Sequence, residues 1–238
     1  ECLGNDFSVI EDVRLSDKDQ NAIKSMNTHL HVIEAYAKLY TVLPSQALKQ
    51  SVTQLLDIFE QHIIDPATCQ QKLFFEKDWT STASVVSYGH DIEAAWLLQE
   101  AAIIIKDAWR IEKFTKFAQS MASEVAANLS PEGAVYNDYH THTQVLDKGI
   151  DWWPQAEAMV GFLNVFENSG NTIYLQHSLT SWAVIKNQFK DAKFGEWFWG
   201  YDASGNLLYK EKAGFWKCPY HNSRACIEVA NRISHLLQ

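Results

Sequence analysis

Four polar and aromatic motifs recur along this chain at nearly equal spacing, each near the start of a segment with helical periodicity. The motifs are Asn27–Glu34, Tyr88–Glu93, Trp152–Glu157 and Trp216–Asn222. Counted from His31 through His90 and Glu157 to His221, the steps are 59, 67 and 64 residues. A step near sixty residues accommodates two helices and their connections. Every second helix is therefore predicted to bring a histidine or a carboxylate to one common cavity.

The sequence between the motifs reads as further helices with two short hairpins. Helices are expected at 21–42, 46–64, 89–106, 109–129, 153–169, 171–190 and 219–237, where apolar residues follow the helical period. Hairpins are expected at 72–87 and at 194–213, with the second turning at Asp202–Asn206, and a long loop is expected at 130–151. No low-complexity segment or linker interrupts this pattern. Residues 1–238 are therefore predicted to form a single domain.

The seven predicted helices are of two alternating kinds. The first, third, fifth and seventh carry the motifs, whereas the second, fourth and sixth are amphipathic and suit an outer layer. Inner and outer helices paired around an axis make an all-α toroid, in which each pair buries its face against its neighbours. Seven helices leave such a ring incomplete. The chain is expected to lack N-terminal helices or to form a smaller open ring, and a homo-oligomer is expected to cover its apolar edge.

Composition narrows the possible partners and location. The net charge is −9 and no run of lysine and arginine exists, which argues against a nucleic-acid partner. No apolar stretch approaches the ~18 residues of a membrane span. The four cysteines show no CxxC spacing and are too sparse for a disulfide scaffold. Reduced thiols and a cytoplasmic location are therefore expected.

The motifs resemble those of one known family. The segments that carry the resemblance are Ser25–His31 (SMNTHLH), Ser87–Ala94 (SYGHDIEA), Trp152–Ala158 (WWPQAEA) and Gly214–Asn222 (GFWKCPYHN). In this order they are similar to the N-acylglucosamine 2-epimerase superfamily, and within it to the cellobiose 2-epimerases. The resemblance implies an (α/α)6 barrel, of which this chain matches the later part. It also implies epimerisation at C2 of the reducing-end glucose of β-1,4-linked disaccharides.

The resemblance further implies a role for each motif residue. It makes His90 and His221 the acid/base pair and His31 the donor that stabilises the intermediate. The residues that it places against the sugar are Asn27, Trp153, Glu157 and Trp216. The expected partner is a small-molecule disaccharide, and no metal or other cofactor is expected.

Elementary chemistry explains why these residue types suit the reaction. Inverting C2 of an aldose requires removing the proton beside the carbonyl and returning one on the other face. With an unperturbed pKa near ~6.5, histidine can accept and donate a proton around neutrality, so two imidazoles flanking C2 can serve both faces. The enediolate formed in between needs hydrogen-bond donors. Glu93 lies one helical turn after His90 and can orient that imidazole.

Plainer interpretations of the same residues remain open. His29 and His31 lie two apart, so on a helix they cannot both bind one metal ion, and His29 is expected to be structural. The loop segment Asp138–His142 contains a second HxH pair, which is a weak metal signal. The alternative functions are another sugar enzyme on the same barrel or a non-catalytic sugar-binding protein. The former could be an N-acylglucosamine 2-epimerase, an aldose–ketose isomerase or an inverting glycosidase.

Overall fold

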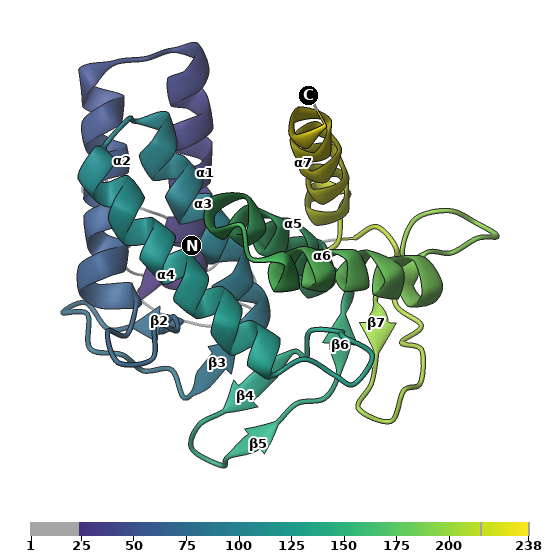
Figure 1. The fold of residues 1–238 in the computed structure, drawn as a ribbon. Coiled ribbons are helices and arrows are strands. Elements are labelled where there is room, and N and C mark those ends of the chain that lie inside the picture. Colours follow the sequence, from purple (N-terminus) through teal and green to yellow (C-terminus); the bar gives the residue numbers. More distant parts are fainter. Residues whose placement is uncertain (1–23, 215, 238) are drawn as a thin grey trace. The chain divides into compact units, whose positions relative to one another are not determined.

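The computed structural model describes residues 24–214 and 216–237, which form helices joined by short strands (Figure 1). The helices are α1 (Met26–Val42), α2 (Gln46–Ile58), η1 (Phe59–Ile63), α3 (Tyr88–Ile104), α4 (Ala108–Ala127), α5 (Trp152–Ser169), α6 (Thr172–Val184), η2 (Ile185–Phe189) and α7 (Tyr220–Leu236). The strands are β1 (Lys24–Ser25), β2 (Phe74–Phe75), β3 (Val85–Ser87), β4 (Asp138–His140), β5 (Val145–Leu146), β6 (Ile150–Asp151) and β7 (Gly200–Tyr201). All seven predicted helices are confirmed over these residues, and the start expected at 21–23 lies outside them. Within the described residues, no helix is long and apolar enough to cross a membrane.

The helices and strands group into two compact units. The first contains the residues up to Val86 together with Leu97–Phe114. The second contains Ser87–Trp96 together with the residues from Thr115 onward. The boundary runs through α3 and α4, so each of these helices contributes a segment to both units. The single domain expected over residues 1–238 is not tested by this grouping and stays a prediction.

In the first unit, α1 packs against α2. Leu30 and Ile33 of α1 and Leu55 of α2 are wholly buried, which is the result expected of two amphipathic faces in contact. Each helix begins after a serine, because the hydroxyl groups of Ser25 and Ser45 accept a hydrogen bond from the backbone N–H three residues further on. Such an N–H has no acceptor within its own helix. The two serines therefore fix where these helices start.

The hairpin predicted at 72–87 forms only in part. An antiparallel bridge joins Phe75 to Ser81 as expected. Strand β2 pairs with β1, however, placing Phe74 opposite Ser25, and β3 belongs to the sheet of β4 and β5. The prediction that 72–87 pairs within itself was therefore wrong for β3. Local alternation of apolar residues identifies a strand but not its partner.

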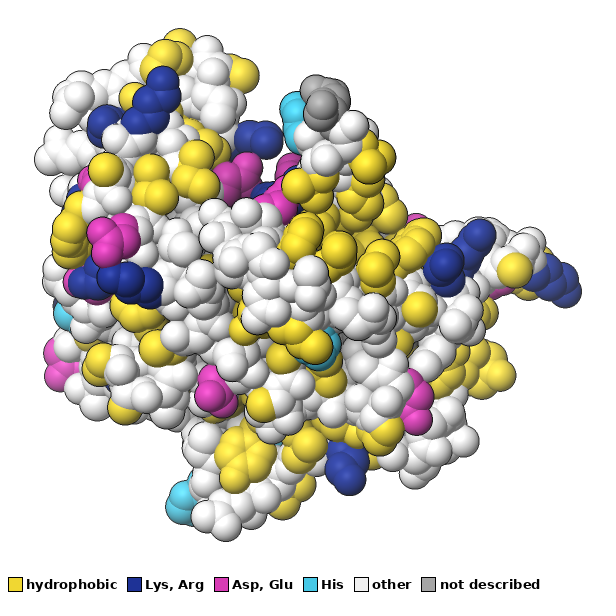
Figure 2. All heavy atoms as spheres, in the orientation of Figure 1, with side chains coloured by type: hydrophobic (Ala, Val, Ile, Leu, Met, Phe, Trp, Pro, Cys, Tyr) yellow, Lys and Arg dark blue, Asp and Glu magenta, His cyan; other side chains and the backbone are white. Residues whose placement is uncertain are grey.

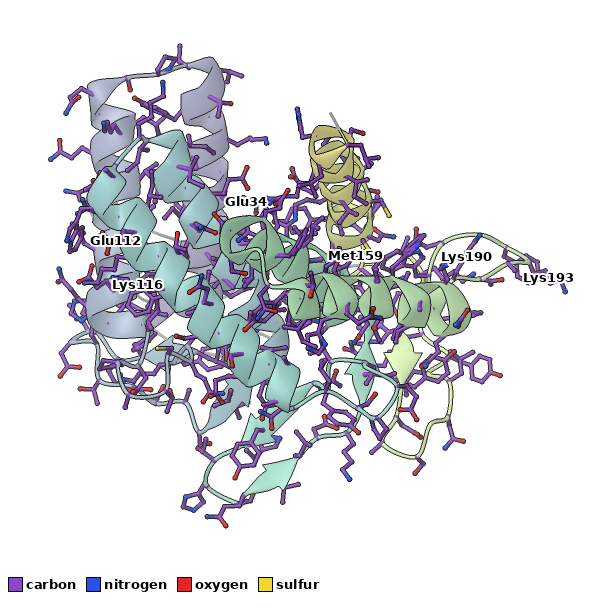
Figure 3. All side chains as sticks on the ribbon, viewed as in Figure 1. Glu34, Glu112, Lys116, Met159, Lys190 and Lys193 are labelled. Atoms are coloured by element: carbon purple, nitrogen blue, oxygen red, sulfur yellow. The ribbon has the colours of Figure 1, made fainter. Side chains whose placement is uncertain are left out.

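The second unit is built around α5, which packs against α6 and α7 (Figure 1). Every residue from Pro154 to Val165 is buried, as expected of a helix with neighbours on all sides. Gly161 permits a close approach to α3, because a Cβ atom there would lie 2.7 Å from the carbonyl oxygen of Ile92. Ser178 of α6 donates a hydrogen bond of 2.7 Å to the carbonyl of Met159, which is labelled in Figure 3. These contacts hold α5 as the central helix of this unit.

Helix α7 is covered on one face only. Asn222 and Ala225 are its buried residues. Hydrophobic side chains gather along one flank of this helix (Figure 2), and Ile227 of this helix is 59% exposed. An incomplete toroid is expected to leave such an apolar flank on its last helix. Covering of this flank by a second copy of the chain stays a prediction.

The connections contain more strand pairing than the sequence predicted. The segment 130–151, expected to be one long loop, holds the antiparallel pair β4–β5 and also β6, which pairs with β7. The turn expected at Asp202–Asn206 is confirmed, because the N–H of Asp202 donates to the carbonyl of Asn206 at 2.9 Å. Gly205 in this turn has a φ of +82°, a conformation that favours glycine.

Candidate active site

The first turns of α3, α5 and α7 bring three motif side chains together within the second unit. The imidazole of His90 lies 4.6 Å from the Trp153 indole, measured between ring centroids. The Trp153 indole also lies 5.5 Å from the imidazole of His221, again measured between ring centroids. Both histidines are only partly buried, so solvent or a ligand can reach them. The structure thus brings together the two residues predicted as the acid/base pair, with one indole touching both.

Local sequence explains how α5 presents Trp153. Pro154 is tolerated because the N–H groups of the first helical turn have no intrahelical acceptor. Gln155 is wholly buried and exchanges two 2.8 Å hydrogen bonds with the backbone of Val135, which fixes the connection before the helix. Gly89 provides the room for the indole, because a Cβ atom there would lie 2.5 Å from the Trp153 ring. The indole is therefore held by packing on two sides.

Glu157 anchors the imidazole of His221. The distance between Nδ1 of His221 and Oε1 of Glu157 is 2.7 Å, and Glu157 is wholly buried. A carboxylate has no hydrogen to give, so Nδ1 donates, and in the neutral imidazole this places the lone pair on Nε2. Trp96 donates to the second carboxylate oxygen at 3.1 Å. The sequence predicted that Glu157 binds sugar, and that role stays a prediction; in the structure its carboxylate is buried and contacts His221 and Trp96.

Arg224 joins the two carboxylates of the site. Its Nη2 donates to Oε1 of Glu93 and to Oε1 of Glu157, each at 2.7 Å. Arg224 was not among the site residues predicted from the sequence. A signal was available, because Arg224 follows His221 by three residues, the same spacing that drew attention to Glu93 after His90.

The ionisation of Glu157 follows from these neighbours. Burial by itself would raise the pKa of its carboxyl group. The charge of Arg224 and the hydrogen bonds from His221 and Arg224 outweigh the burial, so the pKa lies below its usual value. Glu157 is consequently ionised near neutral pH and acts as an acceptor.

Glu93, Glu157 and His221 could also be read as a metal site. Each offers one ligand atom, and the three atoms lie within 4.8 Å of one another. The guanidinium of Arg224 already bonds both carboxylates and supplies a positive charge there. We therefore interpret the two carboxylates as partners of Arg224 rather than as metal ligands. The expectation that the protein needs no cofactor stays a prediction.

One partner of His90 is Ser87. Its hydroxyl oxygen lies 2.9 Å from Nδ1 of the imidazole. Glu93, predicted to orient His90, bonds Arg224 and lies 3.8 Å from Nδ1 of His221. Its carboxylate therefore acts in the part of the site around His221, and its effect on His90 stays a prediction.

The motif on α1 lies in the first unit. His31 and Glu34 face each other there, with 3.7 Å between Nδ1 and Oε2, and Asn27 is exposed in the first turn. His29 is wholly buried, and its Nδ1 contacts the carbonyl of Ser25 at 2.6 Å. That contact supports the structural role predicted for His29. The roles of His31 as intermediate-stabilising donor and of Asn27 in sugar binding stay predictions.

Trp216 stands at the surface in the connection before α7 and is 59% exposed. The residue after it, Lys217, is buried and donates to the carbonyl of Trp197 at 2.5 Å. Asn222 in turn donates to Glu196 at 2.6 Å. These buried anchors hold the connection that carries Trp216, an arrangement suited to the stacking role predicted for it.

A buried carboxyl group at the start of α5 makes stability depend on pH. Burial raises the pKa of Asp151 to about 6, although the charge of Lys210 partly offsets it. Because the folded state binds this proton more tightly than the unfolded state, the ionised carboxylate is destabilising at higher pH. Asp151→Asn should therefore raise the free energy of unfolding by about 1–3 kcal/mol at about pH 7.5.

That gain should shrink as the pH falls below about 6 toward the unfolded pKa near ~4, which urea unfolding at several pH values can measure. Asp202→Asn is the matched control. The pKa of Asp202 is lowered, first by a hydrogen bond from the backbone of Asn206, so its pH dependence has the opposite sign. A gain for Asp151→Asn that is the same at every pH would contradict the prediction.

Comparison with known proteins identifies the family of the chain. The family profile described as N-acylglucosamine 2-epimerase (GlcNAc 2-epimerase) matches residues 9–225. The chain is 43% identical over 230 residues to a cellobiose 2-epimerase of Bacteroides fragilis, covering 96% of this chain and 59% of that protein. The structure of a cellobiose 2-epimerase from Spirochaeta thermophila superposes with a TM-score of 0.85 at 36% identity, covering 94% of this chain and 56% of the other.

A sugar epimerase from a ruminal bacterium superposes with a TM-score of 0.87 at 32% identity, covering 94% of this chain and 58% of that one. The chain thus spans less than two thirds of the length of these relatives. The all-α toroid fold predicted from the alternating helices is confirmed by these similarities. Family profile, sequence identity and fold agree, and the chain belongs to the N-acylglucosamine 2-epimerase family.

Proposed function

We propose that this chain carries the acid/base machinery of a sugar 2-epimerase that acts on the reducing-end glucose of β-1,4-linked disaccharides. The observation that supports this most directly is the contact of His90 and His221 with the same indole, that of Trp153. Both imidazoles are held through Nδ1, by Ser87 and Glu157 respectively. Proton transfer would use the other ring nitrogen, Nε2, of each imidazole.

The proposed reaction starts from the open-chain aldose. One imidazole accepts the proton from C2, and the electron pair of that C–H bond forms the enediolate as the carbonyl oxygen gains negative charge. The other imidazole donates a proton to C2 on the opposite face, which restores the carbonyl with inverted configuration. We assign these roles to His90 and His221, without assigning a face to either.

The other motif residues complete the proposal. His31 would donate a hydrogen bond to the enediolate oxygen, and Asn27 would bind a sugar hydroxyl group. Trp153 and Trp216 would stack on the C–H faces of the sugar rings. Glu93 and Glu157 lie behind His221 and would act on the imidazole rather than on the sugar.

The distance between the carboxylates of Glu93 and Glu157 disfavours one alternative function, that of an inverting glycosidase. An inverting glycosidase needs two carboxyl groups roughly 6.5–9.5 Å apart, with room for a water molecule between them and the sugar. The ligand oxygens of Glu93 and Glu157 lie within 4.8 Å of each other, and both side chains are buried. The arrangement supports proton transfer by histidine better than glycoside hydrolysis.

Incubation of the full-length protein with cellobiose in deuterium oxide tests the proposal. An epimerase incorporates deuterium at C2 of the reducing-end residue and yields glucosyl-mannose, which NMR detects. An aldose–ketose isomerase accumulates a ketose, a glycosidase releases glucose, and a binding protein does none of these. Lactose, mannobiose and N-acetylglucosamine in parallel reactions identify the preferred sugar. If cellobiose stays unchanged and gains no deuterium at C2, the proposed activity on this disaccharide is contradicted.

A further inference from the structure

The buried cluster behind His221 contains one cation and two carboxylates. Glu93 on α3 and Glu157 on α5 are almost wholly buried, and the side chain of Arg224 on α7 is 12% exposed. We propose that Arg224 is a positioning residue that selects the tautomer of His221 through Glu157, keeping the hydrogen on Nδ1 and the lone pair on Nε2. This inference rests on the proposed function, because only a proton transfer at Nε2 gives the tautomer a purpose.

The guanidinium is fixed on several sides. Nη2 is shared between Glu93 and Glu157 at 2.7 Å each, and Nη1 donates to the hydroxyl oxygen of Tyr220. The guanidinium carbon also lies 5.0 Å above the Trp96 ring and 4.2 Å above the Tyr220 ring. A group held this way keeps its charge at one place against the carboxylates.

The charges that face Glu157 come from two other helices. Glu93 faces it from α3, while His221 and Arg224 face it from α7. With Arg224 present, the two carboxylates share one full positive charge. Without Arg224, two buried like charges would lie next to each other, and such a pair retains a proton on one member. We place this proton on Glu157, whose carboxylate lies 2.7 Å from Nδ1 of His221.

Protonation of Glu157 would reverse its hydrogen bond with His221. A carboxylate can only accept the hydrogen of Nδ1, whereas a carboxylic acid can donate its own hydrogen to Nδ1. The neutral imidazole would then carry its hydrogen on Nε2, where it could not accept the proton from C2. The charge of Arg224 thus decides whether His221 can serve as a base at Nε2.

Nitrogen NMR of the full-length protein labelled with 15N-histidine tests this directly, because the two tautomers have different ring-nitrogen shifts. The His221 signals are assigned by their loss in His221→Ala. In the wild-type protein, the neutral form of His221 should carry its hydrogen on Nδ1. Arg224→Met should convert most of the neutral form to the Nε2–H tautomer, whereas Arg224→Lys should retain the Nδ1–H form.

Kinetics supply a second, independent readout. Arg224→Met should lower kcat by at least ~10-fold with little change in KM, because the acid/base group rather than sugar binding is affected. The acid limb of the pH–rate profile should move up by at least ~1 pH unit, the size of effect that one neighbouring charge has on a carboxyl group. Arg232→Met is the matched control, because Arg232 lies on the same helix and is similarly buried, also over the Trp96 ring, but its ion pairs are with Glu167 and Glu228. This variant should leave the tautomer and kcat unchanged.

A double variant keeps the test decisive if Arg224→Met folds poorly. Arg224→Met with Glu93→Gln removes the like charge beside Glu157, so the Nδ1–H tautomer should return. An Nδ1–H tautomer in Arg224→Met, or an Nε2–H tautomer in the wild-type protein, would overturn the inference. The tautomer is measured without sugar. Absence of deuterium incorporation at C2 would therefore contradict the proposed function but not the effect of Arg224 on the tautomer of His221.

Discussion

Replacing either His221 or His90 with alanine is expected to lower kcat of the full-length protein at least ~10²-fold, the usual contribution of a positioned acid or base. Each imidazole lies in ring contact with Trp153 and is contacted at Nδ1, by Ser87 for His90 and by Glu157 for His221, and the proposed proton transfer uses the other nitrogen. Sugar binding should change little, because Trp153 and Trp216, which we propose to stack on the sugar, remain. Initial rates of glucosyl-mannose formation over a range of cellobiose concentrations separate kcat from KM.

Two exposed histidines serve as matched controls for this prediction. His235 lies on the same helix as His221, and His140 lies in β4 of the same unit as His90. His235→Ala and His140→Ala should keep kcat close to that of the wild-type protein. Near-normal turnover in His221→Ala or in His90→Ala would rule out the two-histidine mechanism.

Replacing Phe162 with alanine is expected to lower the free energy of unfolding by about 3–5 kcal/mol. This ring is wholly buried on α5, with the His177 ring of α6 at 5.1 Å and the Tyr174 ring at 6.3 Å between centroids. Its loss would leave a cavity between the two helices, which cannot close because α5 is packed on all sides. Urea unfolding followed by circular dichroism measures the change in midpoint and slope.

The exposed Phe194 provides the control of equal size. It is 75% exposed in the connection after η2, so Phe194→Ala should change the free energy of unfolding by less than ~0.5 kcal/mol. A loss below ~1 kcal/mol for Phe162→Ala would show that α5 and α6 do not form a close-packed interface around this ring.

The helices were predictable because their signals are local. The period of apolar residues located all seven, and the capping serines Ser25 and Ser45 stand at the starts of α1 and α2. The strands were predicted less well. The alternation in 72–87 indicated strands, but the partner of β2 is β1, and pairing between distant segments leaves no local pattern. The cytoplasmic location and the oligomeric state stay predictions.

For the candidate site, the sequence supplied the residue types and their order along the chain. The motif spacing led to His90, Trp153 and His221, which the structure brings into contact within one unit. The same reasoning paired Glu93 with His90 by helical spacing and missed Arg224. Helical spacing identifies neighbours on one helix but says nothing of the side chains that face them from another.

The sequence by itself thus determined the helices, their alternation and the family, since these depend on residues close in the chain or on ordered motifs. Only the tertiary structure decided that Glu157 supports His221 and that Arg224 joins Glu157 to Glu93. These bonds connect residues 64, 67 and 131 positions apart, and they depend on the angle and depth at which α3, α5 and α7 pack. Burial then gives the contacts their strength, because charges removed from water must be neutralised by the groups that happen to face them.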